Sequence, residues 1–436
     1  MEKLLRATNL ILIAVFILGL TSTAYADSAD VLPKGRSRVS VSGAHYFPID
    51  TRFDPDGNEE DIATDYNTTL GSNIFPDLAG FENAQGGPLP DGWANVGASR
   101  VSFEITAEEF TASYQYGLTD KLTVGVQIPY SFYKRKVKSA IKTNGVATDG
   151  VPLGTVGKNP FYDPANADPN NPNDPRWYPL VPGGVLLTTD DVKDLLSGGL
   201  DVNGDGQVDI MGYGYERFKT WSDDGIGDIT VGGRYQYLNN DQWRLAFTGG
   251  IRMPTGNADN PDNLLDMPFG TGAWAILFQF QNDYKATENL VLNFSLKYDL
   301  VLPDRVTLRV PDDVNIPITV NKEKVDRDLG DQFKLDTSAT YQFNDSFSAS
   351  IQYQYWNRLK DKVDGNKGYA YESLEDETDK TAHIFLIGVS YSTISQFLEK
   401  KFPVPLEASV TYENVFAGSN NFLKQDDIIL HLSVYF

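Results

Sequence analysis

The chain has 436 residues, a net charge of −22 and no cysteine. Acidic residues outnumber basic residues 59 to 37, which argues against a nucleic-acid partner because phosphate binding needs a basic face. The lack of cysteine excludes disulfides, thiolate metal sites, thiol nucleophiles and a lipidated cysteine. Beyond the N-terminal region, no run of about 18 apolar residues occurs, so we expect no membrane-spanning helix.

Residues 1–26 have the features of a secretory signal peptide. Two basic residues precede an apolar stretch at 10–20, which is too short to anchor the chain in a bilayer. Ala24 and Ala26 then supply small residues at the two positions that a signal peptidase reads. We therefore expect export and cleavage before Asp27.

The rest of the chain alternates apolar and polar residues with a period of two. The clearest case is 289–303, where every second residue from Leu290 to Leu302 is apolar and the residues between are mostly polar. Successive residues of a strand point to opposite faces, so such a segment has one apolar and one polar face. These segments run to roughly 12 to 18 residues, far longer than the usual strand of about five or six. That length is enough to cross a membrane as a tilted strand.

Twelve segments of this kind are connected by turns and loops that alternate in length. The twelve segments are 36–48, 100–117, 121–138, 224–238, 242–254, 269–285, 289–303, 331–344, 346–360, 380–395, 405–416 and 425–436. The largest loops are 49–99 and 139–223. Short turns on one side and long loops on the other are typical of an outer-membrane barrel, whose turns face the periplasm. The sequence predicts an all-β fold, a transmembrane antiparallel β-barrel of about 12 strands, with residues 27–436 forming a single domain.

One strand changes the phase of its apolar residues. Segment 100–117 has apolar residues at odd positions up to Ile105 and at even positions from Phe110. We expect a β-bulge near Glu108 and Glu109, because an extra residue in one strand shifts the side chains that follow to the other face.

The last strand ends in an alternating apolar pattern that closes on an aromatic residue. The residues on that face are Ile428, Leu430, Leu432, Val434 and Phe436. This pattern resembles the C-terminal signal by which outer-membrane proteins are recognised for barrel assembly. We therefore expect the barrel-assembly machinery to be a partner.

The long loop 139–223 contains a candidate calcium site. Asp201, Asn203 and Asp205 have the spacing at which alternate side-chain oxygens converge on one hard cation. Gln207 would offer its backbone carbonyl, and Asp209 a carboxylate. The twelfth position, where a bidentate glutamate is expected, is a glycine, so a solvated acidic turn remains the alternative. A short capped helix is expected just before this motif, at 188–197.

Two groups of charged residues lie where they could contact solutes or lipids. On the predicted register, eight charged residues face the lumen: Asp228, Arg234, Arg244, Arg252, Lys297, Asp299, Lys334 and Asp336. Their mixed signs argue against a strongly charge-selective ring, and charge pairs that brace the wall are the simpler interpretation. A second group, Lys134, Arg135, Lys136 and Lys138, ends a strand on the outer side. These four either hold phosphates of lipopolysaccharide or form a solvated rim.

Catalysis has little support in the sequence. A phospholipase in a barrel wall would need a serine beside a histidine that an acid or amide orients. The three histidines, His45, His383 and His431, have no recognisable lipase motif near them. We do not expect an enzyme, and we expect no cofactor beyond the possible Ca²⁺ in the outer loop.

Four stretches resemble a known family. They are GLTDKLTVGVQIPY (117–130), DDGIGDITVGGRYQY (223–237), WRLAFTGGIRMPTG (243–256) and DMPFGTGAW (266–274). They are similar to the outer-membrane barrels grouped as the "MetA-pathway of phenol degradation" or transporter-like family. The resemblance implies uptake of aromatic compounds, but the family has no motif from which a functional residue can be assigned to this chain. Residues 27–35 are too few for the N-terminal plug that fatty-acid and toluene channels carry.

Two functions are compatible with these patterns. The first is an outer-membrane channel for passive or facilitated uptake of small molecules, with an aromatic or apolar solute and the lipids of the outer membrane as partners. The second is a surface protein that transports nothing and whose acidic loops bind calcium or another partner.

Overall fold

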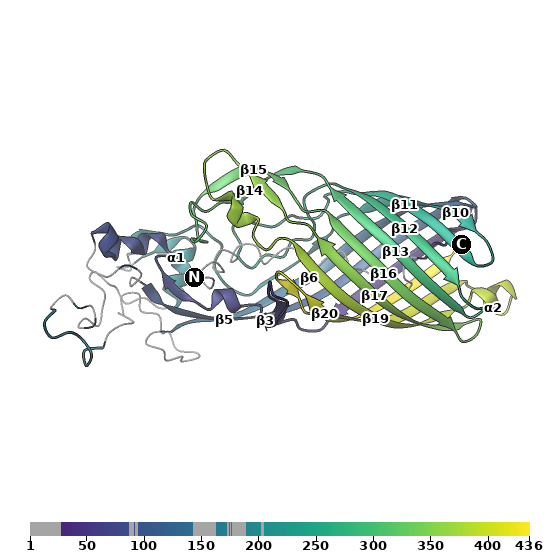
Figure 1. Ribbon diagram of the computed structural model, residues 1–436, viewed down its shortest axis with the longest axis horizontal. Coiled ribbons are helices and arrows are strands. Elements are labelled where there is room, and N and C mark those ends of the chain that lie inside the picture. Colours follow the sequence, from purple (N-terminus) through teal and green to yellow (C-terminus); the bar gives the residue numbers. More distant parts are fainter. Residues whose placement is uncertain are drawn as a thin grey trace.

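The computed structural model describes residues 28–86, 91, 95–142, 163–171, 174, 176, 189–201 and 205–436. The predicted signal peptide 1–26 therefore lies outside the described residues. The described chain forms an antiparallel β-barrel with a large assembly of loops at one end (Figure 1). The C-terminus and the short turns lie at the opposite end (Figure 1). No helix in the described residues is long and apolar enough to cross a membrane.

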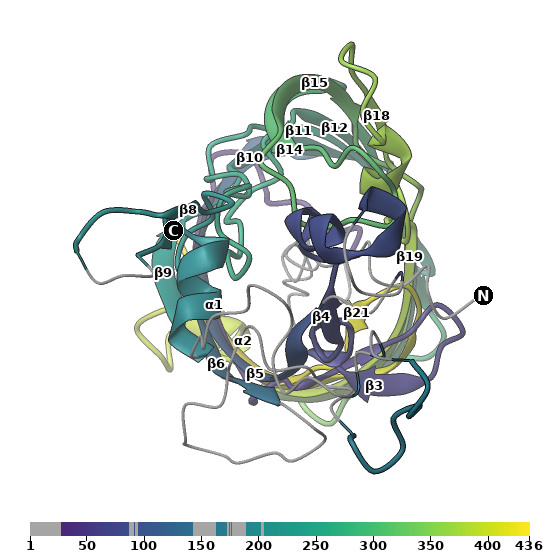
Figure 2. The same ribbon diagram turned by 90° about the vertical axis from the view of Figure 1, so that its left-hand side faces the viewer.

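Twelve strands form the barrel wall, as the alternation predicts. They are β1 (Ser37–Tyr46), β5 (Asn95–Thr119), β6 (Leu122–Lys142), β10 (Thr230–Asn239), β11 (Trp243–Arg252), β12 (Ala275–Lys285), β13 (Leu290–Val301), β16 (Gln332–Gln342), β17 (Phe347–Arg358), β19 (Lys380–Ser392), β20 (Leu406–Gly418) and β22 (Asp426–Tyr435). The ring closes because β1 pairs with both the next wall strand and the last one. Val41 of β1 lies opposite Ala112 of β5 on one side and opposite Leu432 of β22 on the other. Seen from the loop end, the strands form a ring, and the outer loops lie in front of part of its opening (Figure 2).

The two faces of each wall strand meet different surroundings. On β22, Leu430 and Leu432 are exposed on the outside, whereas Ser433 is buried on the inside. Of the other residues of the predicted assembly signal, Ile428 and Phe436 are exposed and Val434 is half-buried. An apolar exterior and a polar interior are what a barrel needs when lipid surrounds it.

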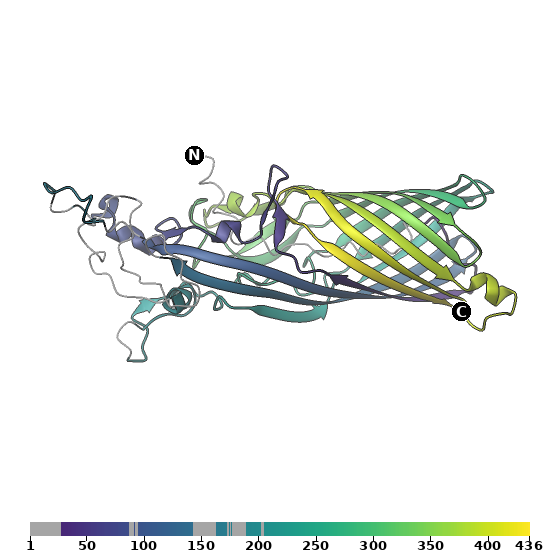
Figure 3. The same cartoon turned by 90° about the horizontal axis from the view of Figure 1, so that it is seen from below.

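Strands β5 and β6 continue far beyond the rest of the ring, as the blue pair in Figure 3 shows. They pair without a register shift from Ala98 opposite Lys142 to Gly117 opposite Thr123. The predicted bulge at Glu108 and Glu109 is therefore wrong. The apolar residues change faces because the inward side chains above this level, such as Phe103 and Ile105, belong to the apolar core of the outer loops. Above that level its inward face packs on the outer loops instead of lining a polar lumen.

Two other predicted segments have different bounds in the structure. The segment 224–238 is divided between β9 (Trp221–Ile226), which pairs with the outer part of β6, and β10. The segment 269–285 begins only at Ala275, because residues before it fold inward as part of a loop. The predicted helix at 188–197 is confirmed as α1 (Thr189–Leu196). A second short helix, α2 (Ile394–Leu398), lies in the turn between β19 and β20.

The long loops carry short elements of their own. They are the strands β2 (Thr51–Phe53), β3 (Glu59–Asp61), β4 (Thr69–Gly71), β7 (Gly199–Leu200), β8 (Ile210–Met211), β14 (Asp304–Arg309), β15 (Lys322–Asp328), β18 (Lys362–Asp364) and β21 (Phe422–Leu423), and the 3₁₀ turns η2 (Thr64–Tyr66), η3 (Pro76–Phe81), η4 (Asn83–Gln85) and η6 (Tyr371–Leu374). An apolar core joins these loops to the upper hairpin, with Tyr66, Phe103 and Phe218 among its buried residues. The outer end is therefore a folded assembly with its own core.

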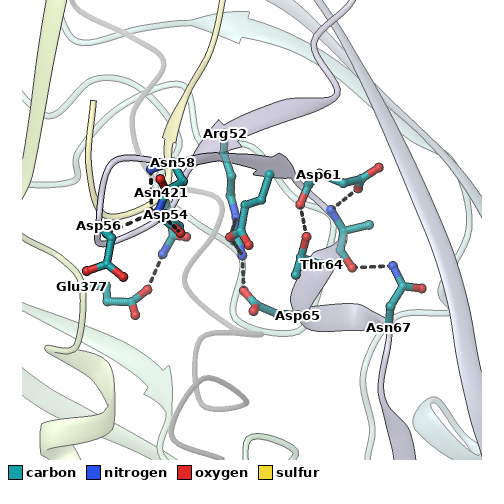
Figure 4. A network of polar contacts seen from close by, with 12 residues as sticks. Arg52, Asp54, Asp56, Asn58, Asp61, Thr64, Asp65, Asn67, Glu377 and Asn421 are labelled. Carbon is teal, nitrogen blue, oxygen red and sulfur yellow. Dashed lines mark hydrogen bonds and ion pairs between the residues drawn. The ribbon is translucent and has the colours of Figure 1, made fainter. Parts of the chain in front are cut away.

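A polar network fastens the first outer loop. Arg52 of β2 is almost completely buried, and its guanidinium pairs with Glu60 at 2.7 Å and with Asp65 at 2.5 Å (Figure 4). Burial alone lowers the pKa of Arg52, but these two carboxylates outweigh that effect and raise it. Beside this pair, Asn421 donates a hydrogen bond of 2.8 Å to Glu377, which links two other outer loops.

Candidate functional site in the barrel lumen

The barrel encloses a cavity of about 960 Å³. At the turn end its wall includes Ile394 and Phe397 of α2. At the loop end its wall includes Phe269 and Thr271, from the loop between β11 and β12. The cavity thus extends along the lumen between the turn end and the loop assembly, and its wall combines polar and apolar groups. Its size is that of cavities that bind small molecules.

The N-terminal residues Ser28–Pro33, which we call the strap, lie inside the lumen at the turn end. Asp283 of β12 accepts hydrogen bonds from the hydroxyl of Ser28 at 2.9 Å and from the amide of Ala29 at 3.1 Å. Gln236 of β10 donates to the carbonyl of Ala29 at 2.9 Å, and Ala29 is completely buried. The strap is shorter than a plug domain, yet it occupies part of the lumen.

The strap continues along the wall on the other side of β10. The amide of Leu32 donates to the hydroxyl of Thr123 at 2.7 Å. Gly117 has no side chain where the strap crosses it, and a Cβ there would lie only 2.2 Å from the carbonyl oxygen of Pro33. These contacts hold the backbone of the strap in one position against the barrel wall.

At the loop end, one carboxylate holds an inward-folded loop in place. Asp228, which lies between β9 and β10, accepts hydrogen bonds from the amide of Gly256 at 3.1 Å and from the amide of Thr271 at 2.8 Å. It therefore fastens both ends of segment 256–271. Phe269 of this segment lines the cavity and stacks on Tyr133 of the outer core, with ring centres 5.4 Å apart. Phe269 thus separates the cavity from the apolar core of the outer loops.

The same segment contains an aspartate in an unusual environment. Burial, with the nearby carboxylate of Asp266, raises the pKa of Asp259 to about 7, although Arg135 and Arg327 oppose the shift. Asp259 lies on the wall of a small cavity between the outer loops.

The eight charged residues predicted to face the lumen have distinct positions. Five of them are on the cavity wall: Asp228, Arg234, Arg252, Lys297 and Lys334. Asp299 and Asp336 are buried beside them as counterions. Three ion pairs result, and they join Arg252 to Asp299 at 3.0 Å, Lys297 to Asp299 at 3.5 Å, and Lys334 to Asp336 at 3.6 Å.

The two remaining arginines of this group contact the strap. Arg244 pairs with Asp30 at 2.5 Å and with Asp283 at 3.2 Å. Arg234 donates to the carbonyl of Ser28 at 2.6 Å. These long-range partners could not be read from the sequence.

The candidate calcium loop is described only in part, since Asn203 lies outside the described residues. The carboxylate of Asp201 accepts the amides of Asp205 at 3.2 Å and of Gly206 at 2.7 Å, and that of Asp205 accepts the amide of Gln207 at 2.8 Å. Asp209 donates its amide to Leu200, next to the β7–β8 pairing. The described residues contain no group of three or more His, Asp or Glu side chains that is arranged to hold a metal ion. Calcium binding at this loop stays a prediction.

The three histidines have different surroundings. His431 lines the cavity and lies between the hydroxyls of Ser42 at 2.7 Å and Ser433 at 2.8 Å. His383 contacts the hydroxyl of Tyr353 at 2.7 Å, and His45 is exposed at the outer edge of the wall. The contact between Ser42 and His431 joins the first and last strands. The sequence around Ser42 and the sequence around His431 give no sign of this contact.

Sequence reasoning missed three residues that shape this site. Asp283 and Gln236 lie on inward-facing positions that the alternation of their strands identifies, but nothing local shows what they bind. Phe269 lies in the stretch 266–274, at the position where the alternation predicts the start of a strand. Only the fold places these residues at the two ends of the cavity.

A closed twelve-stranded antiparallel barrel with an apolar exterior and a polar lumen defines the class: the protein is an outer-membrane β-barrel. Residues 184–397 match the family model described as "Putative MetA-pathway of phenol degradation", which confirms the family resemblance found in the sequence. No curated protein sequence matches the chain.

Solved structures of outer-membrane barrels resemble the chain. The COG4313 outer membrane channel from Pseudomonas putida F1 is 13% identical, with a TM-score of 0.51, and the alignment covers 95% of this chain and 100% of that chain. A Pseudomonas aeruginosa FadL homologue is 11% identical, covering 92% of this chain and 90% of that chain, with a TM-score of 0.33. The Ralstonia pickettii toluene transporter TbuX is 10% identical, covering 93% of this chain and 90% of that chain, also with a TM-score of 0.33. At 13% identity, the similarity to the COG4313 channel supports the fold and nothing more. The other two structures are too dissimilar to support any conclusion about this chain.

Proposed function

We propose that the protein is a channel for passive or facilitated uptake of small molecules, including aromatic and apolar solutes, across the outer membrane. The observation that supports this proposal most directly is the cavity of about 960 Å³ along the lumen, between the strap and Phe269. Its wall offers apolar groups beside the charge pairs of Arg252, Lys297 and Lys334, which suits a small molecule with a ring and a polar substituent. The match to a family named for phenol degradation points the same way.

In this proposal the two ends of the cavity control passage. On the outside, Phe269 and the segment that Asp228 fastens must move before a solute enters the cavity. On the periplasmic side the strap narrows the exit. The protein is accordingly a narrow channel with a low resting conductance. Export depends on residues 1–26, with cleavage before Asp27.

Single-channel recording in a planar lipid bilayer tests this proposal. The mature protein is refolded and recorded with and without simple phenols, and its folding is verified by heat-modifiable gel mobility. Discrete conductance steps support a channel, and a dose-dependent block by phenols supports an aromatic solute. A silent bilayer with folded protein would contradict the channel and favour the surface protein whose acidic loops bind calcium or a partner.

A further inference from the structure

The upper part of the β5–β6 hairpin has an outward face that differs from the rest of the barrel exterior. From Phe110 on β5 and Phe132 on β6 toward the turn end the outward side chains are apolar, and these two phenylalanines are each 43% exposed. Above it the apolar residues Phe103 and Ile105 point inward and are buried in the core of the outer loops. Lipid requires an apolar exterior, so the outer edge of the hydrocarbon layer lies close to Phe110 and Phe132.

The outward side chains directly above this edge are basic. On β6 they are Lys134, Lys136 and Lys138, and Arg100 lies on β5 on the same face, one pair beyond Lys138. All four are exposed. Alternate residues of a strand are about 7 Å apart along it, and the headgroup layer on each side of a membrane is roughly 5–8 Å thick. On a tilted strand, Lys134 and Lys136 therefore lie at the height of the lipid headgroups.

Arg135, which the sequence grouped with these lysines, does not belong to this face. Its side chain points inward, is buried and lies over the ring of Phe103 at 5.9 Å. The reason is the strand period of two, which turns Arg135 away from the two lysines that flank it.

This face carries more basic than acidic side chains, although Glu104 lies among its lysines. Lys136 is paired across the hairpin with Glu104, but within the described part of the chain Lys134 and Lys138 make no ion pair. Some other cations on the outer loops do lie beside a carboxylate, such as Arg305 with Asp326 and Lys424 with Glu59. The chain as a whole carries a net charge of −22, so a local excess of exposed basic residues indicates an anionic partner at this place.

Two carboxylates lie at the lower border of this face, level with Phe132. They are Glu108 and Asp224, and each already has a partner in the wall. Glu108 lies 3.4 Å from the ring of His45, and Asp224 accepts a hydrogen bond from the hydroxyl of Tyr130. Both carboxylates therefore lie between the lysines and the hydrocarbon layer. The part of the face further out, at the height of the headgroups, stays basic.

We propose that this basic face, made of Arg100, Lys134, Lys136 and Lys138, binds the phosphate groups of lipopolysaccharide in the outer leaflet. Ammonium groups bind phosphate as point charges, and the height of this face above the aromatic edge matches a lipid headgroup rather than a soluble molecule. The contact fixes the long hairpin against the membrane surface and so orients the loop assembly that the hairpin supports.

The test is a titration of the folded full-length mature protein in a zwitterionic detergent with lipopolysaccharide, with bound lipid measured by native mass spectrometry. The variant K134Q/K136Q/K138Q is compared with the unmodified protein. We expect its apparent affinity to fall at least about tenfold, because each lysine near an anionic lipid surface contributes roughly a fivefold factor. Lipopolysaccharide that has been enzymatically dephosphorylated should bind the unmodified protein as weakly as intact lipopolysaccharide binds the variant.

The matched control is K121Q/K285Q/K400Q, which removes the same charge from exposed lysines at the turn end of the barrel. It should bind lipopolysaccharide like the unmodified protein. Equal binding by the two triple variants would overturn the proposal, and so would loss of binding in EDTA, which would assign the lipid to divalent cations on the acidic loops. Competition by inorganic phosphate or phosphatidylglycerol at equal concentration would show that the face selects phosphate in general rather than lipopolysaccharide. Heat-modifiable mobility verifies that every variant is folded.

Discussion

The carboxylate of Asp228 accepts hydrogen bonds from both the amide and the hydroxyl of Thr271, at 2.8 and 3.1 Å. Together with the bond from Gly256, these contacts hold segment 256–271 across the outer end of the lumen. One side chain between β9 and β10 therefore holds a loop whose two ends lie 28 and 43 residues further along the chain.

The first prediction concerns this loop. D228A removes three hydrogen bonds to a charged group, each of which contributes about 1.5–3 kcal/mol. We expect segment 256–271 to loosen, which should increase both the single-channel conductance and the rate of proteolytic cleavage in this segment. D228N keeps the shape and part of the hydrogen bonding and should give a smaller effect. Unchanged conductance in D228A, with faster cleavage, would mean that the loop does not limit passage.

The second prediction concerns the strap. Replacing residues 28–33 by a Gly-Ser sequence of the same length removes the side chains of Leu32 and Asp30 and leaves the chain length intact. We expect a larger conductance, because the replaced segment loses the ion pair of Asp30 with Arg244 and the buried side chain of Leu32 and is held on the wall by backbone hydrogen bonds alone. D283N weakens the anchor that holds Ser28 and Ala29 and should act in the same direction. D241N, in the exposed turn between β10 and β11, is the control, and an equal response in that variant would exclude a specific role of the strap.

The third prediction concerns Arg52 in the first outer loop. R52A leaves Glu60 and Asp65 without their buried cation, which costs about 3–5 kcal/mol when a pair of this kind is broken. We expect faster hydrogen exchange in residues 51–66, while the barrel keeps its heat-modifiable mobility. R52K retains the positive charge but cannot contact both carboxylates as the planar guanidinium does. Its exchange rates should therefore lie between those of R52A and those of the unmodified protein. Exchange rates that do not change in R52A would show that the loop is held by its apolar contacts.

The fourth prediction is a dependence of stability on pH. Because the folded protein raises the pKa of Asp259 to about 7, it holds a proton between pH ~4 and pH ~7 that the unfolded chain has lost. The contribution of Asp259 to the free energy of unfolding therefore falls as the pH rises from about 4 to about 7. Above that range this contribution no longer changes with pH. In D259N the fall should be absent. The unfolding temperatures of the two proteins should be similar at pH 4, and D259N should be the more stable protein at pH 8. A constant difference at all pH values would exclude the titration of Asp259 as its cause.

The fifth prediction is that calcium binds the loop 201–209. Isothermal titration with Ca²⁺ should show one site in the unmodified protein, and D201N/D205N should reduce the affinity at least about tenfold, since both carboxylates would be ligands of a hard cation. Calcium should also slow proteolysis of this loop. D54N/D56N removes two carboxylates from another acidic loop and is the control. Absence of heat with the unmodified protein would leave the solvated acidic turn as the correct interpretation.

The sequence by itself determined the barrel and most of its wall. Alternation with a period of two is a local property of each strand, and one face of every strand must meet lipid. The residues on either side of a strand such as β13 therefore could be assigned without any knowledge of their neighbours. The number of strands, the positions of the turns and the inward direction of Arg252 or Lys297 follow from the same rule.

Only the tertiary structure decided which residues lie at the two ends of the cavity and how far the outer loops reach along the β5–β6 hairpin. The contacts between Ser28 and Asp283, or between Asp228 and Thr271, join residues far apart in sequence and leave no local pattern. The switch of the apolar residues from one face of β5 to the other near Glu108 also depends on contacts between residues far apart in sequence. A period-two sequence shows which residues share a face, but it does not show whether that face meets lipid or the core of the loops. That distinction depends on how far the β5–β6 hairpin rises above the ring, which the packing of the outer loops determines.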